Sequence, residues 1–466
     1  MKNNFFMMKC HTPRILLAAP KSGSGKTTVT AALLSALKNR GLSVQAFKAG
    51  PDFIDPMYQE QITGRPSVNL DTYLAGSEMA ASLFTWHCGE QRTDLAVVEG
   101  VMGLFDGAGG VEETGSSYDL ARALGCPILL VIDARGTGRS LLALLSGFLA
   151  MDHAHLIRGV LLNRVPGSFA KILAQLVETN LHLPVVGCFP EEENLRLESR
   201  HLGLVLPGES GFKDSLFRAA ALLEANADLG KILAIAQQAG VIEGTDSPFP
   251  ETGGAPFRVA AARDEAFCFT YQDNLNLLRA MGAEIVPFSP LHDWMLPEDV
   301  QGLYLPGGYP ELHAGELSEN RRMREDVREK LEGGLPCIAE CGGFLYLLEF
   351  MEDMEGNCFP MAGYLPGQAK YMGHLVRFGY LELREKTPRF LRSGEGIRGH
   401  EFHYYDATDC GRDCTAEKPV SHRRFDCVHE NGNQFLGFPH LYWPSCPSFA
   451  AHFSDLCRIY GKRKET

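Results

Sequence analysis

The sequence predicts an α/β protein of two domains, and three observations support that prediction. Alternating strand-like and helix-like segments run from residue 14 to about residue 240, which predicts a mainly parallel sheet with helices on both faces. The stretch 239–256, AGVIEGTDSPFPETGGAP, is rich in Gly, Pro, Thr and acidic residues and lacks apolar periodicity. A second α/β pattern begins after it. We therefore expect domains at 1–238 and 257–466, joined by a linker at 239–256.

Composition narrows the class of protein. The chain has 466 residues, 45% of them hydrophobic and 22% charged, which is typical of a globular protein with more than one core. Its 44 basic and 57 acidic residues give a net charge of −13, which argues against a nucleic-acid-binding surface. The N-terminal apolar run is too short for a signal peptide, and no stretch approaches the roughly 18 apolar residues of a membrane span. We expect a cytoplasmic protein with neither nucleic acid nor membrane as partner.

The cysteines do not indicate a disulfide framework. There are 13, an odd number, and none forms a CxxC pair. Cys410 and Cys414 have the spacing of a metal-binding pair, but no second pair or suitably spaced histidines accompany them. Most of the cysteines are expected to be small buried apolar residues.

The first domain contains six expected strands, and the residues that follow them are expected to bind ligand. A helix is expected at 27–39, with Gly41 just past its end as a C-cap. In a parallel sheet, ligands bind beyond the carboxyl ends of the strands. The expected strands are 15–19, 43–47, 95–99, 128–133, 157–163 and 185–189.

A glycine-rich loop, PKSGSGKTT at 20–28, lies between the first strand and the first helix, which is the order that a nucleotide phosphate site requires. Glycines at two positions permit positive φ and close approach of the backbone to phosphate. Lys26 would reach the outer phosphates, and Thr27 offers a hydroxyl to Mg²⁺. The nucleotide-binding residues are expected to be Gly23, Gly25, Lys26, Thr27 and Thr28. The first domain is therefore predicted to be a P-loop NTPase that binds ATP.

The loop departs from the common pattern at its start. Pro20 stands where GxxxxGK[ST] has its first glycine, and Lys21 supplies an additional cation. The sequence instead fits KxGxGK[ST], a deviant pattern found in a group of dimeric P-loop proteins. A homodimer is compatible with that pattern.

Acidic side chains follow two further strands. Asp52 and Asp55 lie in GPDFIDP, and Glu99 and Asp106 lie in EGVMGLFDG. Because both stretches end neighbouring strands, we expect them to face the nucleotide phosphates. Hard oxygen ligands of this kind suit Mg²⁺, with Thr27, Asp52 and Glu99 as expected ligands. A solvated loop or a helix cap is the alternative for each acid taken singly.

Later strand ends leave their alternatives open. Arg135 can pair with a phosphate or a carboxylate, and Asn163 can read a base edge, but either can equally make a local structural contact. The polar cluster Glu198, Arg200 and His201 is compatible with substrate contact or with an ordinary helix start.

In the second domain, an apolar strand leads into Cys341 and then into an apolar helix. This is the arrangement of a nucleophile elbow, in which a sharp turn exposes the side chain and the helix N-terminus lowers the thiol pKa. Gly342 and Gly343 keep bulk away from the thiol. A second glycine-rich strand end, LPGGYPE at 305–311, offers the N–H of Gly308 as an oxyanion hole together with that of Gly342. Strands are expected at 258–262, 284–288 and 303–305, and a helix at 274–280.

A thiolate that attacks a carboxamide needs a general base, normally a histidine. His440 lies in GFPHLYW, after a strand-like segment near the C-terminus. His400 and His403 lie three residues apart, on opposite faces of any strand. The candidates are His374, His400, His403, His440 and His452.

Several long motifs occur in one order along nearly the whole chain: KSGSGKTT, FKAGPDFIDPMY, NLDTYL, VVEGVMGLFDG, ESRHLGLV, RDEAFCFTYQDNL, LPGGYPELHA, AECGGFLYL and RGHEFHY. With them the sequence resembles the cobyrinic acid a,c-diamide synthase family. That family joins a dethiobiotin-synthetase-like ATPase domain to a class I glutamine amidotransferase domain.

The resemblance implies ATP-dependent amidation of the a and c carboxylates of a cobalt corrinoid, cobyrinic acid, with glutamine as nitrogen donor and Mg²⁺ beside ATP. Cys341 would be the glutaminase nucleophile and His440 its base. Asp52, Asp55, Glu99 and Asp106 would serve metal, phosphates or substrate. One position departs from class I amidotransferases, because Tyr442 stands where an acid usually follows the histidine by two residues.

The chemistry of the residues agrees with this implication. Phosphoryl transfer to a carboxylate would form an acyl phosphate, which ammonia from the Cys341 site would displace. Because free ammonia is lost or protonated in water, a shielded path between the domains is expected. Two related enzymatic readings stay open, namely amidation of nickel sirohydrochlorin and synthesis of cobyric acid. A P-loop partition or scaffold ATPase with an inactive second domain is the alternative from another class.

Overall fold

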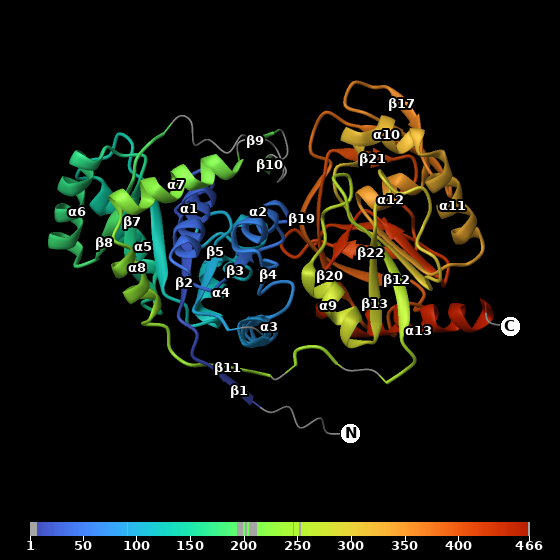
Figure 1. The fold of residues 1–466 in the computed structure, drawn as a ribbon, viewed down its shortest axis with the longest axis horizontal. Helices are drawn as coiled ribbons and strands as arrows, with labels where there is room; N and C mark the ends of the chain where they lie inside the picture. Colours follow the sequence, from blue (N-terminus) through green and yellow to red (C-terminus); the bar gives the residue numbers. More distant parts are fainter. Residues whose placement is uncertain are drawn as a thin grey trace. The chain divides into compact units, whose positions relative to one another are not determined.

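The computed structural model describes residues 7–90, 92–192, 199–200, 203–204, 212–245, 247–250 and 253–464. The chain forms two compact units, Met1–Pro248 and Phe249–Thr466, each with its own sheets and helices (Figure 1). The division between them falls inside the stretch 239–256, where the composition of the chain changes. No helix in the described ranges is both long and apolar enough to cross a membrane.

The first unit is built on a seven-stranded parallel sheet in the order β4-β3-β5-β2-β6-β7-β8. All six strands expected from the sequence are present, and the edge strand β4 adds a seventh. β4 has only three residues, too few for an apolar pattern to reveal it. The strands are β2 (Arg14–Ala18), β3 (Val44–Ala49), β4 (Val68–Leu70), β5 (Leu95–Glu99), β6 (Ile128–Asp133), β7 (Ile157–Asn163) and β8 (Val185–Phe189).

Helices connect these strands, as in other parallel sheets, and two more follow the last strand, β8. They are α1 (Lys26–Asn39), α2 (Ile54–Thr63), α3 (Ser77–Glu90), α4 (Ser117–Ala123), α5 (Leu141–Met151), α6 (Gly167–Leu181), α7 (Phe212–Asn226) and α8 (Leu229–Ala236). Leu33 and Leu37 of α1 pack with Val97 of β5 and Leu223 of α7 in one buried cluster. This packing fixes α1 on the sheet, so that its first turn stands at the carboxyl end of β2.

The segment expected to be a linker contains a strand. β11 (Ile242–Thr245) pairs antiparallel with β1 (Met7–Cys10), and Cys10 is opposite Ile242. Another small sheet pairs β9 (Ser199–Arg200) with β10 (Gly203–Leu204). Of the polar cluster considered above, Arg200 lies in β9, whereas Glu198 and His201 lie outside the described residues.

The second unit has a six-stranded sheet in the order β13-β12-β14-β15-β25-β24, parallel except for β24. The expected strands near 258–262, 284–288 and 303–305 are all present, as is the helix near 274–280. The strands are β12 (Phe257–Ala262), β13 (Ala283–Phe288), β14 (Gly302–Leu305), β15 (Cys337–Glu340), β24 (His429–Glu430) and β25 (Gln434–Gly437).

Two further sheets complete this unit. One has the order β17-β16-β18-β21, and an antiparallel sheet has the order β23-β22-β19-β20-β26. Their strands are β16 (Leu348–Glu352), β17 (Cys358–Pro360), β18 (Leu365–Tyr371), β19 (Arg377–Glu385), β20 (Ile397–His403), β21 (Tyr405–Ala407), β22 (Cys414–Glu417), β23 (Arg424–Cys427) and β26 (His440–Leu441).

The helices of the second unit are α9 (Gln272–Ala280), α10 (Ala314–Glu319), α11 (Arg321–Glu332), α12 (Gly342–Leu347) and α13 (Pro447–Lys464), with the 3₁₀ turns η3 (Pro310–His313) and η4 (Trp443–Ser445). The chain leaves β25 in the parallel sheet and enters β26 in the antiparallel sheet after only two residues. This crossing carries His440 from one sheet to the other.

Candidate active sites

The loop between β2 and α1 has the backbone geometry of a phosphate cradle. Gly23 and Gly25 both adopt positive φ, +75° and +90°, where a side chain would strain the backbone. Asn163, at the end of β7, donates from Nδ2 to the carbonyl oxygen of Ser24 over 2.8 Å. A Cβ on Gly25 would overlap that amide. Of the two roles considered for Asn163, the structure therefore shows the local one, a brace that holds the loop.

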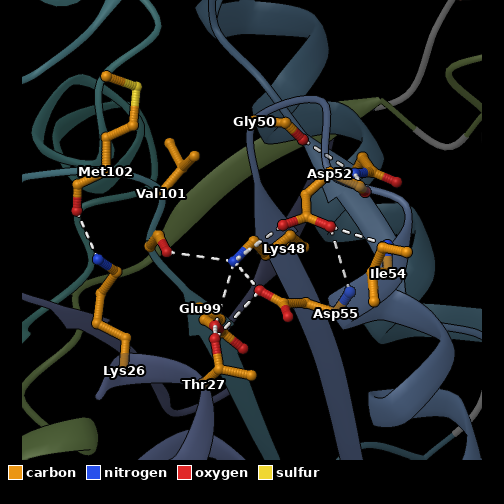
Figure 2. Close-up of polar contacts among 12 residues, drawn as sticks. Lys26, Thr27, Lys48, Gly50, Asp52, Ile54, Asp55, Glu99, Val101 and Met102 are labelled. Carbon is orange, nitrogen blue, oxygen red and sulfur yellow. Dashed lines mark hydrogen bonds and ion pairs between the residues drawn. The ribbon is translucent and has the colours of Figure 1, made fainter. Parts of the chain in front are cut away.

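Lys26 begins α1 and extends along the inside of the loop. Its Nζ donates to the carbonyl oxygen of Met102 over 2.5 Å (Figure 2). Met102 has φ +49°, an unusual value for a residue with a side chain, and this conformation orients the carbonyl. Burial lowers the pKa of Lys26 to about 8. Thr28 occupies the third position of the same helix.

Lys48, to which the sequence analysis assigned no role, lies at the centre of the acidic residues (Figure 2). It is 3% exposed, and its Nζ is 3.1 Å from Glu99 Oε1, 3.7 Å from Asp52 Oδ2 and in closer contact with Asp55. Register explains the meeting with Glu99, because the two residues are partners in the parallel pair of β3 and β5. The available signal was a lysine near the end of a fully buried strand.

Thr27 joins this cluster from the phosphate loop. Its hydroxyl donates to Glu99 Oε1 over 2.7 Å, and Gln59 of α2 donates to Glu99 Oε2 over 2.8 Å. Burial raises the pKa of Glu99 to about 8. Burial also opposes ionisation of Asp55, but the charge of Lys48 together with hydrogen bonds from Lys48 and the neighbouring acids outweighs it and leaves the pKa of Asp55 lowered. Of these two neighbouring carboxyl groups, Asp55 is therefore the more readily ionised.

Asp52 and Asp106 make additional local contacts. Asp52 Oδ1 accepts from the backbone N–H of Ile54 and of Asp55, so this residue caps α2 while its other oxygen faces Lys48. Asp106 Oδ2 accepts from the N–H of Gly103 in its own loop over 3.0 Å. Asp52 therefore makes the kind of contact that the helix-cap alternative describes, and Asp106 holds its own loop.

The donor set fits a hard divalent cation. The Thr27 hydroxyl and the carboxyl groups of Asp55 and Glu99 converge on one point, where the ammonium of Lys48 contacts both acids. No group of three or more His, Cys, Asp or Glu side chains within the described ranges is arranged to hold a metal alone. Mg²⁺ beside a nucleotide needs no such group, since it takes one or two protein carboxylates together with phosphate and water oxygens.

In the second unit, Cys341 occupies the sharp turn between β15 and α12. Its φ of +46° and ψ of −108° are strained for a residue with a side chain. Its N–H donates to the carbonyl oxygen of Gly437 over 2.8 Å, and its carbonyl accepts from Leu345 at the start of the helix. A Cβ on Gly343 would overlap the carbonyl oxygen of Leu305. The expected strand–turn–helix arrangement is present.

A pair of glycines after β14 brings the other parts of this site together. A Cβ on Gly307 would overlap Cε1 of His440, so the imidazole packs against that backbone. A Cβ on Gly342 would lie 3.1 Å from the backbone nitrogen of Gly308. The nucleophile turn and His440 therefore contact adjacent residues of one loop, and Gly308 and Gly342 are neighbours, as an oxyanion hole would require.

The other histidine candidates have different surroundings. His400 is the register partner of His440 across β20 and β26, and His403 stacks on Phe438 with ring centroids 4.1 Å apart. His374 is exposed and bonded to the Met372 carbonyl, and His452 packs on Phe390. Tyr442, at the position where class I enzymes usually place an acid, packs its ring edge-on against Tyr271.

Burial sets the protonation of both central groups. It raises the pKa of the Cys341 thiol, and the N–H of Gly342, which donates to the sulfur, only partly opposes this. The expected net lowering of the thiol pKa is wrong for this structure: the helix N-terminus contributes in that direction, but burial of Cys341, which is 7% exposed, outweighs it. Burial lowers the pKa of His440 to about 3. The resting pair is a neutral thiol and a neutral imidazole.

Comparison with known proteins identifies the two domains that contain these sites. Residues 15–205 match the model of the CobQ/CobB/MinD/ParA nucleotide binding domain, and residues 258–443 match that of the CobB/CobQ-like glutamine amidotransferase domain. Cobyrinate a,c-diamide synthase of Listeria innocua is 38% identical over 464 residues, covering 97% of this chain and 99% of that protein. The enzymes of that name from Picrophilus torridus and Salmonella typhimurium are 36% and 38% identical, each covering 95% of this chain and 98% of their own length. The chain belongs to the cobyrinate a,c-diamide synthase family.

Family membership confirms the predicted fold class, a P-loop nucleotide-binding domain and a glutamine amidotransferase domain, both α/β. It also confirms that the protein is an enzyme, a ligase. An inactive second domain on a partition or scaffold ATPase, the alternative from another class, does not agree with relatives that align along both domains.

Proposed function

We propose that this protein converts the a and c carboxylates of cobyrinic acid to amides with ATP and glutamine, in cobalamin biosynthesis. The observation that supports this most directly is the presence in one chain of two complete sets of groups. One is the phosphate loop with its Lys48–Asp55–Glu99 cluster, and the other is Cys341 with His440 and the paired glycines.

In the first unit, the chemistry is activation of a carboxylate. A carboxylate is a poor electrophile, so transfer of the γ-phosphoryl group of ATP would convert it to an acyl phosphate. The loop N–H groups and Lys26 would bind and orient the phosphates, because charge stabilisation dominates catalysis of phosphoryl transfer. Mg²⁺, held by Thr27, Asp55 and Glu99 with Asp52 at the border, would neutralise phosphate charge when bound.

In the second unit, the chemistry is release of ammonia from glutamine. His440 takes the proton of the Cys341 thiol, and the thiolate attacks the γ-carboxamide carbon. The N–H groups of Gly308 and Gly342 stabilise the resulting oxyanion. Return of the proton to the nitrogen breaks the C–N bond and releases ammonia, and water then hydrolyses the thioester to glutamate. Ammonia displaces phosphate from the acyl phosphate and forms the amide.

The compartment and the partners also belong to this proposal. The cosubstrates ATP and glutamine, and thirteen cysteines that are all free, support the cytoplasm as its compartment. The Lys21 pattern of dimeric P-loop proteins supports a homodimer. Nucleic acid is not among the proposed partners, in keeping with the net charge of −13.

Mass spectrometry of reaction products tests the substrate. The protein is incubated with ATP, Mg²⁺ and glutamine and one of three candidates: cobyrinic acid, nickel sirohydrochlorin, or the a,c-diamide that a cobyric acid synthase would extend. We expect two amides to be added to cobyrinic acid. Preferential amidation of either other compound, or none at all, would overturn this assignment.

A further inference from the structure

Three buried carboxyl groups act electrostatically on the nucleophile of the second unit. Glu311, Glu340 and Glu401 each raise the pKa of the Cys341 thiol through their charge, so all three lie within electrostatic reach of the sulfur. Their exposed fractions are 8%, 2% and 0%. Buried carboxylates are costly unless a cation or several hydrogen bonds compensate them.

Two of the three are compensated within the protein. Glu401 has Lys418 Nζ at 3.4 Å and Arg377 Nη1 at 3.6 Å. Glu340 accepts hydrogen bonds from the Tyr304 hydroxyl at 3.1 Å, and from the Trp443 indole and the Leu441 N–H at 3.3 Å each. Neither has its charge available for a ligand.

Glu311 differs from both. Throughout the part of the chain that the structure describes, no lysine, arginine or histidine forms an ion pair with it, and its carboxylate accepts no hydrogen bond from another side chain. Burial raises its pKa to about 7, and the only opposing contribution is a hydrogen bond from its own backbone. A neighbouring hydroxyl, that of Tyr405, is also buried and, among the described residues, has no hydrogen-bond partner.

The backbone places Glu311 beside the reacting groups. It lies three residues after Gly308, in the 3₁₀ turn η3. The preceding residue, Pro310, packs on the nucleophile turn, since a Cβ on Gly342 would lie 2.8 Å from its Cδ. One short loop thus carries an oxyanion-hole glycine at one end and an uncompensated carboxylate at the other.

We propose that Glu311 binds the α-ammonium group of the glutamine whose carboxamide reacts at Cys341. The inference rests on the proposed glutaminase function and adds the group that selects an amino acid over a simple amide. In glutamine, only two methylene groups separate the carboxamide carbon from the carbon that carries the ammonium. A ligand held at Cys341 and Gly308 by its carboxamide therefore brings a cation toward the same loop, and this cation supplies the charge that Glu311 lacks.

Two substrates and one substitution test this role. Glutaminase activity of the full chain is measured with glutamine and with glutaramic acid, which has the same carboxamide and carboxylate but no ammonium group. We expect Glu311→Gln to raise KM for glutamine by roughly 10- to 100-fold, the range for loss of a charged hydrogen bond, with a smaller change in kcat. KM for glutaramic acid should stay unchanged, so that the preference for glutamine collapses. Amidation with added ammonium should also be unchanged.

The controls separate binding from folding. Glu316→Gln, in the exposed pair with His313, should leave both KM values unchanged. Glu311→Asp retains the charge and should recover part of the preference for glutamine. Equal losses on both substrates, or a fall in kcat alone, would show a structural role for Glu311 and overturn the inference. A wild-type protein that hydrolyses no glutamine would instead overturn the proposed function, and the inference with it.

Discussion

The two sites differ in the charge of the groups that they present to their ligands. The site of the first unit is charged: Lys48 lies within ion-pair distance of Asp52, Asp55 and Glu99, beside a loop that ends in Lys26. The reacting pair of the second unit is neutral, with an uncharged thiol and an uncharged imidazole packed against glycine backbone.

The difference follows from the ligands. A nucleotide with its metal is highly charged. Its binding replaces ion pairs within the protein by ion pairs with the ligand, so charged side chains matter most at the first site. A carboxamide is neutral, and its activation needs close placement of hydrogen-bond donors in a pocket without water. The packing of side chains and backbone around the carboxamide therefore matters most for its activation. Charge substitutions should damage the first site most, and added volume should damage the second.

The largest expected effect is that of Lys26→Ala. Loss of a buried cation at the phosphates should lower amidation by about 10²–10³-fold or more, with glutamine or with ammonium as nitrogen source. Glutaminase activity, measured by glutamate release, should be retained. Lys38→Ala, near the end of the same helix, is the control and should keep amidation. If Lys26→Ala lost as much glutaminase activity as amidation activity, the assignment of the two reactions to separate sites would be wrong.

Gly307→Ala tests the second site by volume. A single methyl group would overlap the imidazole of His440 and displace the base, so glutaminase activity should fall by about 10²-fold. Ammonium-driven amidation should persist. Gly315→Ala is a matched control, because its Cβ would meet Phe359 at 3.6 Å, an ordinary contact. Normal glutaminase activity in Gly307→Ala would contradict the assignment of His440 as base.

A smaller effect is expected from Asn163→Ala, which removes the brace of the phosphate loop. Loss of one hydrogen bond should raise KM for ATP roughly tenfold. Because the brace does not touch the base, the ratio of activities with ATP and GTP should stay the same. A changed ratio would show that Asn163 reads the base, the alternative that the sequence left open.

The smallest effect concerns stability in the second unit. Burial raises the pKa of Glu340 to about 8, so the folded protein holds a proton that the unfolded chain loses from the ordinary glutamate value upward. This contribution to the free energy of unfolding is complete at low pH and is lost as pH rises through about 8. Glu340→Gln should therefore lose less thermal stability than the wild type between about pH 5 and about pH 8. If both proteins lost the same thermal stability over this pH range, the ionising group would be a residue other than Glu340.

The sequence predicts the charged site and the neutral site to different depths. The glycine pattern and the acids at strand ends identified the phosphate loop, and strand register then brought Glu99 to Lys48, a partner that no linear motif names. The sequence predicts the strand–turn–helix arrangement at Cys341. The pKa of its thiol depends on how deeply the fold buries it, which the local pattern of a six-residue helix does not show. Glu311 lies in the motif LPGGYPELHA, but whether a basic side chain pairs with it depends on where all the other side chains lie.

One comparison of nitrogen sources tests the central claim, that ammonia is made at Cys341 and used at the ATP site. Cys341→Ala and the wild type are each given ATP, Mg²⁺ and cobyrinic acid, with either glutamine or ammonium. Cys358→Ala, which removes an exposed cysteine of the same unit, is the control. We expect Cys341→Ala to form no amide from glutamine and to form both amides from ammonium. Amide formation from glutamine by this variant, or failure with both sources in a folded protein, would contradict the account.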